Sequence, residues 1–297
     1  MYPAELQEKV DSYLEALRFA AEPGTAKLEE AMRYSLLAGG KRIRPVLALA
    51  TAEALDRPPD EVLPLAAALE MVHTYSLIHD DLPAMDDDEL RRGKPTCHVA
   101  FGEDVAILAG DGLFAEALRL AMAEQRGEPA NVLAAVREIV TAAGTHGMVG
   151  GQFLDVAGDA AATRAGGARE PSNIDLRRLH ELKTGALIAA SVGCVLALEG
   201  VSGPATMPFR RFAAELGVVF QIVDDILDVT GDEAELGKPR GSDERHGKAT
   251  YVSVFGLERA RELAKESHVA ARAALAEVDG ATGRLAQIAD YILTRTT

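Results

Sequence analysis

Sulfur and the largest aromatic side chain are scarce in this sequence. The chain has no tryptophan, and its 297 residues include only two cysteines, Cys97 and Cys194. So few cysteines cannot form a disulfide framework in a chain of this length, which suits a reducing compartment. We therefore expect a cytoplasmic protein in which Cys97, with no partner cysteine near it, is a packed thiol.

Positive charge and long apolar runs are also in short supply. The chain has 31 basic and 46 acidic residues, a formal net charge of −15. Because binding nucleic acid needs a basic face, we expect no nucleic-acid partner, and any phosphate site must be local. The longest apolar run, Ala186–Leu198, is too short for a membrane span and predicts a buried helix. The acidic amphipathic start, MYPAELQEKVDSYLEAL, does not have the pattern of a signal peptide.

No segment alternates apolar and polar residues as a strand would, whereas almost every segment has helical periodicity. With 48% hydrophobic and 26% charged residues, the composition is that of a soluble globular protein with a sizeable core. We predict a single all-α domain over residues 1–297, a bundle of about ten helices. The expected helices cover residues 3–20, 27–38, 44–55, 61–79, 103–126, 129–155, 173–200, 204–231, 251–278 and 283–294. A mobile loop is expected at 156–172 and a polar, glycine-rich loop at 231–248.

The segment HTYSLIHDDLPAMDDDELRRGKPTC, which begins at His73, concentrates negative charge. Pro83 cannot continue the preceding helix, so Asp80 and Asp81 fall near the C-terminal end of that helix. The helix dipole already places partial negative charge there, so these carboxylates need a positive partner. Magnesium is the natural candidate, because it takes one or two carboxylates and keeps positions open for phosphate oxygens. Six acidic residues lie within ten positions: Asp80, Asp81, Asp86, Asp87, Asp88 and Glu89.

A second acidic group lies in FQIVDDILDVTGD, 144 residues after the first (224 − 80). Asp224 and Asp228 are four residues apart and share a helix face, with Asp225 beside them. Gly231 is a plausible helix stop, so this group also lies in the last turns of a helix. A charge run is usually a solvated surface. Because both groups have apolar flanks, we favour a shared site for metal and phosphate.

Basic residues accompany the aspartates. The glycine-rich junction GGKRIRP, with Lys41 and Arg44, exposes backbone amides between two helices, which suits a diphosphate. Arg91 and Arg92 follow the first aspartates directly, so one guanidinium can bind a metal-bound phosphate and the other a second phosphate.

Lysines also occur near the second acidic group. Lys183 with Thr184 lies within an apolar helix, where a lysine either extends to solvent or meets a buried anion. Lys238 and Lys248 lie in the loop after the second aspartates and can close over a phosphate as a lid.

Three uncharged side chains stay ambiguous on spacing alone. His73 lies close to two helical turns before Asp80 and can face the same cavity, but a lone histidine on a helix is more often a core residue. His79 is expected to point elsewhere. Gln221 either lends an amide to a phosphate or bonds to the backbone.

Five motifs occur in a characteristic order over about residues 25–255: GGKRIRP, SLIHDDLPAMDDDELRRGKPT, GMVGGQFLD, KTG, and FQIVDDILDVTGD followed by GK. With them the chain resembles the trans-prenyltransferases (polyprenyl synthetases), especially bacterial farnesyl or geranylgeranyl diphosphate synthases. The resemblance implies an isoprenoid synthase-type bundle around a deep central cavity, usually a homodimer. It also implies that isopentenyl diphosphate is joined to an allylic diphosphate with magnesium, three ions per active site. The chain departs from the family in two places, the missing proline after Tyr251 and the Ala/Gly-rich loop 156–172, which bear only on lid closure.

The resemblance assigns roles by matched position. The catalytic positions are Asp80, Asp81, Asp86, Asp224, Asp225, Asp228 and Lys183, and the magnesium ligands among them are Asp80, Asp86 and Asp224. The positions for the allylic diphosphate are Arg91, Lys183, Thr184, Gln221 and Lys238, to which Lys248 is added as a lid residue. The positions for isopentenyl diphosphate are Lys41, Arg44, His73 and Arg92, so the resemblance makes His73 a ligand.

Product length should depend on the depth of the cavity below the aspartates. Tyr75 precedes Asp80 by five residues, about 7.5 Å along a helix at ~1.5 Å per residue, and its ring can form a floor. Ser76 beside it is too small to do so. An aromatic residue here resembles the bacterial farnesyl type, so we favour a fifteen-carbon product, with a twenty-carbon product as the alternative. The plain reading of Tyr75 is a packed aromatic.

Two other classes of protein share parts of this pattern. A class I terpene cyclase would replace the second aspartate motif with an Asn/Ser/Glu-type site and line its cavity with aromatics, whereas this chain has DDILD and 5% aromatic residues. A non-catalytic synthase subunit would be expected to lose one aspartate motif, and this chain has both.

Overall fold

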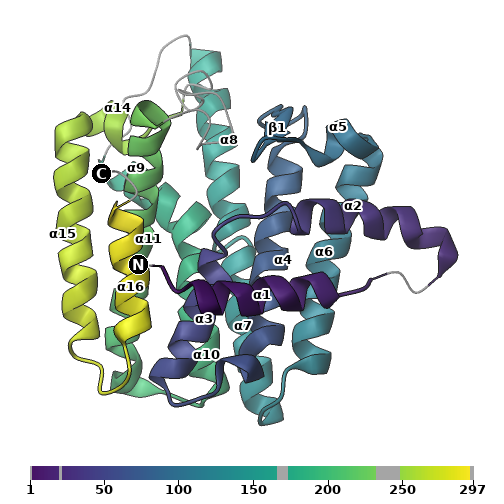
Figure 1. Cartoon of the computed structure of the whole chain (residues 1–297). Helices are drawn as coiled ribbons and strands as arrows, with labels where there is room; N and C mark the ends of the chain where they lie inside the picture. Colours follow the sequence, from purple (N-terminus) through teal and green to yellow (C-terminus); the bar gives the residue numbers. More distant parts are fainter. Residues whose placement is uncertain (1, 20–21, 166–172, 232–247, 295–297) are drawn as a thin grey trace.

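A computed structural model describes residues 2–19, 22–165, 173–231 and 248–294. These residues form a helical bundle, so the predicted all-α fold class is confirmed (Figure 1). The helices are α1 (Ala4–Ala16), α2 (Ala26–Leu36), α3 (Ile43–Ala54), α4 (Leu63–Asp80), α5 (Cys97–Phe101), α6 (Glu103–Glu124), α7 (Pro129–Ala143), α8 (Met148–Ala165), α9 (Asn173–His180), α10 (Ala186–Leu198), α11 (Met207–Thr230), α14 (Tyr251–Phe255), α15 (Leu257–Leu275) and α16 (Gly283–Thr294).

The apolar helix α10 lies in the interior of the bundle. It packs against α3, α4, α7 and α11, and the apolar side chains on all its faces are buried. Pairs of longer helices, α4 with α6 and α11 with α15, complete the walls. The buried apolar cluster runs from Leu6 in α1 to Ile292 in α16. This continuity supports the prediction of a single domain.

One helical stretch in the described part of the chain, Leu176–Leu198, is long and apolar enough to cross a membrane by those two criteria alone. Within its apolar window 61% is buried inside the bundle, as in the core helix of a soluble protein. Burial by other helices explains its composition.

Glycines end two helices that the sequence predicted to continue. Residues 129–155 form two helices, α7 and α8, because the chain leaves the helix at Gly144. The N–H of Gly144 donates to the carbonyl oxygen of Val140, and the backbone of Gly144 is extended (ψ −158°). Residues 251–278 divide into α14 and α15 at Gly256, whose φ is +80°. A positive φ is available to glycine at little cost and cannot continue a right-handed helix.

Two other predictions were wrong. Residues 156–165 were predicted as a loop but continue α8, because the high helix propensity of alanine compensates for the missing apolar stripe. No strand was expected, yet β1 (Leu90–Arg91) and β2 (Lys94–Pro95) pair antiparallel. Arg92 and Gly93, both with positive φ, form the two-residue turn typical of a hairpin. The rest of the predicted loops, 166–172 and 232–247, lies outside the described residues.

Both acidic groups lie at the end of a helix, as predicted. Helix α4 ends at Asp80, three residues before Pro83. Helix α11 ends at Thr230, immediately before Gly231, so Asp224 lies within its last two turns.

The packing of α11 gives a test of the core. Phe212 is fully buried, whereas Met207 on the same helix is 58% exposed. Replacing a buried phenylalanine by alanine removes apolar contacts and leaves a cavity, so Phe212→Ala should destabilise the protein by about 3–5 kcal/mol. The midpoint of urea unfolding measures this change, and Met207→Ala, the matched control, should shift it little. Equal midpoints for the two variants would contradict this packing.

Candidate active site

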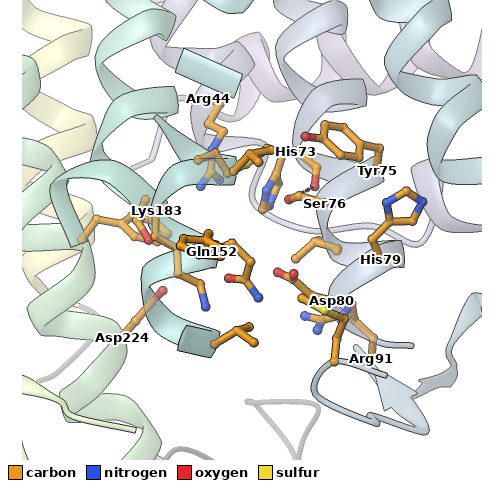
Figure 2. Close-up of a pocket in the computed structure, with 18 of the residues that line it drawn as sticks. Arg44, His73, Tyr75, Ser76, His79, Asp80, Arg91, Gln152, Lys183 and Asp224 are labelled. Atoms are coloured by element: carbon orange, nitrogen blue, oxygen red, sulfur yellow. Dashed lines mark hydrogen bonds between the residues drawn. The ribbon is translucent and has the colours of Figure 1, made fainter. Parts of the chain in front are cut away.

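A cavity of about 590 Å³ lies among α4, α8, α11 and the chain around Lys183. Figure 2 shows Asp80 and Asp224 on opposite sides of it, with Gln152 between them. The two aspartates, 144 residues apart in sequence (224 − 80), therefore belong to one site. Its wall combines apolar side chains (Met148, Val149, Phe153, Val156 and Phe220) with charged or polar ones (Arg44, His73, Asp80, Arg91, Arg92, Gln152, Lys183, Thr184 and Asp224).

The chain folds back after α4 and brings Asp86 to Asp80. The N–H of Asp86 donates to the carbonyl oxygen of Asp80 over 2.9 Å. Burial raises the pKa of the Asp80 carboxyl to about 6; Lys183 opposes this shift, and the charge of Asp86 adds to it. A cation close to this carboxylate would stabilise its ionised form.

Lysine ammonium groups lie beside the carboxylates. Lys248 Nζ is 2.9 Å from Asp86 Oδ2, and Lys183 Nζ is 2.5 Å from Asp155 Oδ2. These lysines offset part of the negative charge. These ion pairs hold the two ammonium groups in position beside the carboxylates.

Of the six predicted catalytic aspartates, Asp80 and Asp224 line the cavity, whereas Asp81, Asp86, Asp225 and Asp228 do not. Asp81 and Asp225 instead hold other side chains in place. Asp81 is buried and accepts two hydrogen bonds from Arg91 Nε, at 2.8 and 3.0 Å, with the Nη2 group of the same guanidinium against it. Burial raises the pKa of Asp81, and the hydrogen bonds from Arg91 oppose that shift. The pair orients Arg91, which does line the cavity.

A chain of hydrogen bonds runs behind Asp224. Thr184 Oγ1 donates to Gln221 Oε1 over 2.9 Å, and Gln221 Nε2 donates to Asp225 Oδ1 over 2.7 Å. Asp225 Oδ2 also accepts from the backbone N–H of Tyr251. These hydrogen bonds connect the residues around Lys183 with α11 and α14. Of its members Thr184 reaches the cavity; Asp228 is buried on α11 and does not line it.

The basic side of the cavity is formed by Arg44, Arg92 and His73. Arg44 is buried, its Nε has no hydrogen-bond partner among the described residues, and its guanidinium carbon lies 5.9 Å from the centre of the Phe220 ring. Burial lowers the pKa of Arg44 and Arg92. Burial, aided by the neighbouring arginines, also lowers the pKa of His73, so this imidazole is neutral. A buried cation with a nitrogen unpartnered within the described ranges, as at Arg44, is suited to bind an anion.

At three residues the sequence prediction differs from the structure or falls outside the residues that it describes. Lys41 is exposed and does not line the cavity; its Nζ lies 5.6 Å from the centre of the Tyr291 ring. Lys238 lies outside the described residues. His79 was expected to point elsewhere but lines the cavity, with Nε2 3.1 Å from the carbonyl oxygen of Ile107.

Sequence reasoning missed Gln152 and Asp155. Gln152 Oε1 is buried without a partner among the described residues and lines the cavity, and Asp155 binds Lys183. Both lie in GMVGGQFLD, three residues apart and so on one helix face. That spacing was the available signal.

A π-helical turn, Glu181–Gly185, presents Lys183 and Thr184. Such turns interrupt α-helices at functional sites and change the direction of side chains. It is held closely on both sides. A Cβ at Gly151 would lie 2.3 Å from the backbone nitrogen of Lys183, and one at Gly217 would lie 3.0 Å from the Cα of Gly185. Only glycine permits α8 and α11 to approach this turn so closely.

The carboxylates fit a hard divalent cation by donor chemistry. Asp80, Asp86 and Asp224 could supply oxygen ligands, and a cation would offset the burial that raises the pKa of Asp80. No group of three acidic, histidine or cysteine residues converges on one point within the described ranges. An ion held here would therefore take its other ligands from water or phosphate, as magnesium usually does.

Gly151 provides a test of this geometry. In Gly151→Ala the new methyl group would collide with the Lys183 backbone and displace the ammonium group. Affinity for magnesium pyrophosphate, measured by calorimetry, should fall by about tenfold or more, because misplacement by about 1 Å has large effects at such sites. Gly185→Ala is the matched control, since its Cβ would meet only an ordinary contact, 3.5 Å to the carbonyl oxygen of His180. Unchanged affinity in a normally folded Gly151→Ala variant would contradict the close approach.

Comparisons with known proteins agree with this arrangement. A family model for polyprenyl synthetase matches residues 25–288. The farnesyl diphosphate synthases of Geobacillus stearothermophilus and Escherichia coli (strain K12) are 44% and 42% identical to the chain; the matches cover 98% and 99% of it, and 94% and 99% of those proteins. The geranylgeranyl pyrophosphate synthase of Capsicum annuum is 42% identical, over 99% of this chain and 78% of that protein.

A solved structure has the same fold. Geranyltransferase from Helicobacter pylori, complexed with magnesium and isoprenyl diphosphate, is similar with a TM-score of 0.85 and 32% identity, and the match covers 98% of this chain and 95% of that one. The match of the family model and of full-length relatives settles the family, and the paired aspartate sites around one cavity agree with it. This chain belongs to the polyprenyl synthetase family of trans-prenyltransferases.

Proposed function

We propose that this protein joins isopentenyl diphosphate to dimethylallyl or geranyl diphosphate and forms trans-farnesyl diphosphate. One observation carries the proposal: Asp80 and Asp224, one aspartate from each acidic group, line the same apolar-walled cavity as Arg44, Arg91 and Arg92. An ion-bridged diphosphate fits between the acidic groups, and a second diphosphate fits the arginines.

The two substrates have separate positions in this proposal. The allylic diphosphate lies between Asp80 and Asp224, where Arg91, Lys183 and Thr184 line the wall, with Gln221 behind Thr184. The match of sequence motifs assigns Lys238 and Lys248 to a lid; Lys248 is paired with Asp86, and Lys238 lies outside the described residues. Isopentenyl diphosphate lies against Arg44, Arg92 and His73. Because His73 is neutral, it donates one N–H bond and adds no charge.

Magnesium, when bound at Asp80, Asp86 and Asp224, supplies positive charge to the leaving diphosphate. Lys183 and Arg91 stabilise the same charge from their fixed positions, since Asp155 and Asp81 hold them there. The allylic C–O bond breaks, the isopentenyl double bond attacks the allylic C1, and the leaving diphosphate accepts the proton that is lost. The chain supplies no nucleophile.

The apolar wall has two tasks. Met148, Val149, Phe153 and Val156 line the cavity beside the aspartates and exclude water from an allylic cation. They also receive the growing tail. The energy for the step comes from electrostatic placement and exclusion of water.

Tyr75 and its neighbour Phe114 support the fifteen-carbon product. Tyr75 lines the cavity, and its ring packs edge-on against Phe114 of α6, with centroids 5.1 Å apart. Two interlocked rings form a firmer floor than one. Geranylgeranyl diphosphate is the second candidate product, favoured by the similarity to the Capsicum annuum enzyme.

We also propose a cytoplasmic homodimer that binds three magnesium ions per active site. Support for the dimer comes from the outer faces of α6 and α7. Leu108 and Met122 in α6 are 55% and 58% exposed, and Leu133 in α7 is 66% exposed. Exposed large apolar side chains on neighbouring helices are typical of a protein interface. Light scattering should give twice the chain mass.

The function is tested by the product. Purified protein with isopentenyl and dimethylallyl diphosphates and magnesium should yield farnesyl diphosphate, identified by mass spectrometry, and a chelator should stop the reaction. Asp80→Asn should lower kcat by about 10²–10³, because it weakens the stabilisation of the leaving group. Asp279→Asn, at an exposed aspartate, is the matched control. Turnover in the presence of chelator, or full activity of Asp80→Asn, would refute the proposal.

A second test concerns product length. Tyr75→Ala should open the cavity past its floor and shift the product toward twenty carbons or more, as seen in the chain-length profile. Ser76→Ala removes only a hydroxyl that donates to the carbonyl oxygen of His73, so its profile should match that of the unaltered protein. If Tyr75→Ala kept a fifteen-carbon product, Tyr75 would not be the floor.

A further inference from the structure

The basic junction between α2 and α3 is fixed by one side chain that lines the cavity and by two that do not. Three successive carbonyl oxygens, those of Gly39, Gly40 and Lys41, each accept a side-chain hydrogen bond. The donors are Arg92 to Gly39, Gln7 Nε2 to Gly40 at 3.1 Å, and the Tyr2 hydroxyl to Lys41 at 2.5 Å. Two of these three donors come from α1 or the residues just before it.

Arg42 anchors the same junction from within. Its side chain is buried and does not line the cavity, with Nε 2.8 Å from Asp11 and Nη1 2.7 Å from Glu70. Its Nη2 donates to the carbonyl oxygen of Leu36 over 2.9 Å. The backbone at Arg42 has a φ of +51°, a conformation that persists in a non-glycine residue only where its surroundings enforce it. Asp11 and Glu70 provide that enforcement.

One face of α1 supplies the contacts. Gln7 and Asp11 are four residues apart and lie on the same face. Figure 1 shows α1 lying across α3 and α4, with the N-terminus beside α16. There the Tyr2 ring packs at a tilt against Tyr291, with ring centroids 4.7 Å apart, and Lys41 Nζ lies near the Tyr291 ring. None of Tyr2, Gln7 and Asp11 lines the cavity.

The contacts at the junction affect the position of two cations that line the cavity, Arg44 and Arg92. Residues 39–42 lead directly into Arg44, whose buried guanidinium lines the cavity. The Arg92 group that bonds to Gly39 also lines it, so the junction and the cavity wall share that arginine. A shift of the junction would therefore move Arg44 and Arg92 together and leave Asp80, Asp224 and Lys183 where they are.

We propose that Tyr2, Gln7 and Asp11 are positioning residues for the isopentenyl diphosphate half of the site, through the junction 39–42. This inference rests on the proposed function. The inference predicts different effects on the two substrates. Loss of the contacts from α1 weakens the binding of isopentenyl diphosphate and leaves the binding of the allylic substrate unchanged. A helix that merely covers the core through Leu6, Val10 and Leu14 would have no such selectivity.

The double variant Tyr2→Phe/Gln7→Met tests the inference. It removes both donors to the junction and retains the Tyr2 ring and the helix. We expect the KM for isopentenyl diphosphate to rise about tenfold, as loss of two hydrogen bonds suggests, with kcat and the KM for geranyl diphosphate changed by less than about twofold. Lys9→Met is the matched control, because it breaks the contact of α1 with Asp60, 2.6 Å long, which does not involve the junction.

A second measurement reports the binding of isopentenyl diphosphate without turnover. Calorimetry with isopentenyl diphosphate alone should show the same loss of affinity in the double variant, and Tyr2→Phe alone should show a smaller one. Equal changes in both KM values, or no change in a folded double variant, would overturn the inference. Absence of condensation by the unaltered protein would instead overturn the proposed function, so the two failures are distinct.

Discussion

The site depends on partly buried carboxylates at the end of a helix, an arrangement that is unfavourable unless cations offset it. Asp80 closes α4, where the backbone carbonyls already carry partial negative charge, and its partial burial raises the pKa of its carboxyl. Lys183 lowers the cost, and it in turn is held by Asp155. Lys183, Lys248 and Arg91 are each paired with an acidic group, so these charges are positioned before any substrate arrives.

Rigid packing makes this positioning possible. Helices α3 and α10 are buried along nearly their whole length, and they support the helices that carry the charged groups. Where precision matters most, the helices touch through backbone: Gly151 and Gly217 bring α8 and α11 against the π-helical turn. A close-packed interior transmits small displacements, so a single methyl group at Gly151 should act on Lys183.

The sequence predicted those features that local chemistry determines, and missed those that tertiary contacts determine. Pro83 and Gly231 marked the helix ends at the aspartates correctly, because proline and glycine act on the backbone directly. The π-helical turn at Lys183 has no local signature; it exists because two glycines on other helices accept it. Likewise, nothing in KRIR indicates that Arg42 turns to Asp11 and Glu70 while Arg44 lines the cavity, since only the partners across the fold decide that.

The overall charge explains why a buried cation matters at this site. At a net charge of −15, the protein as a whole repels an anionic substrate, and cations scattered over its surface would be screened by salt. Arg44 avoids both effects, because it is buried, where charges interact over a lower dielectric, whereas Arg92 is exposed and is held at the cavity by its bond to Gly39. Burial makes Arg44 costly to the folded state, so the position of both arginines must be enforced by neighbours, and those neighbours lead outward from the cavity to the first helix of the chain.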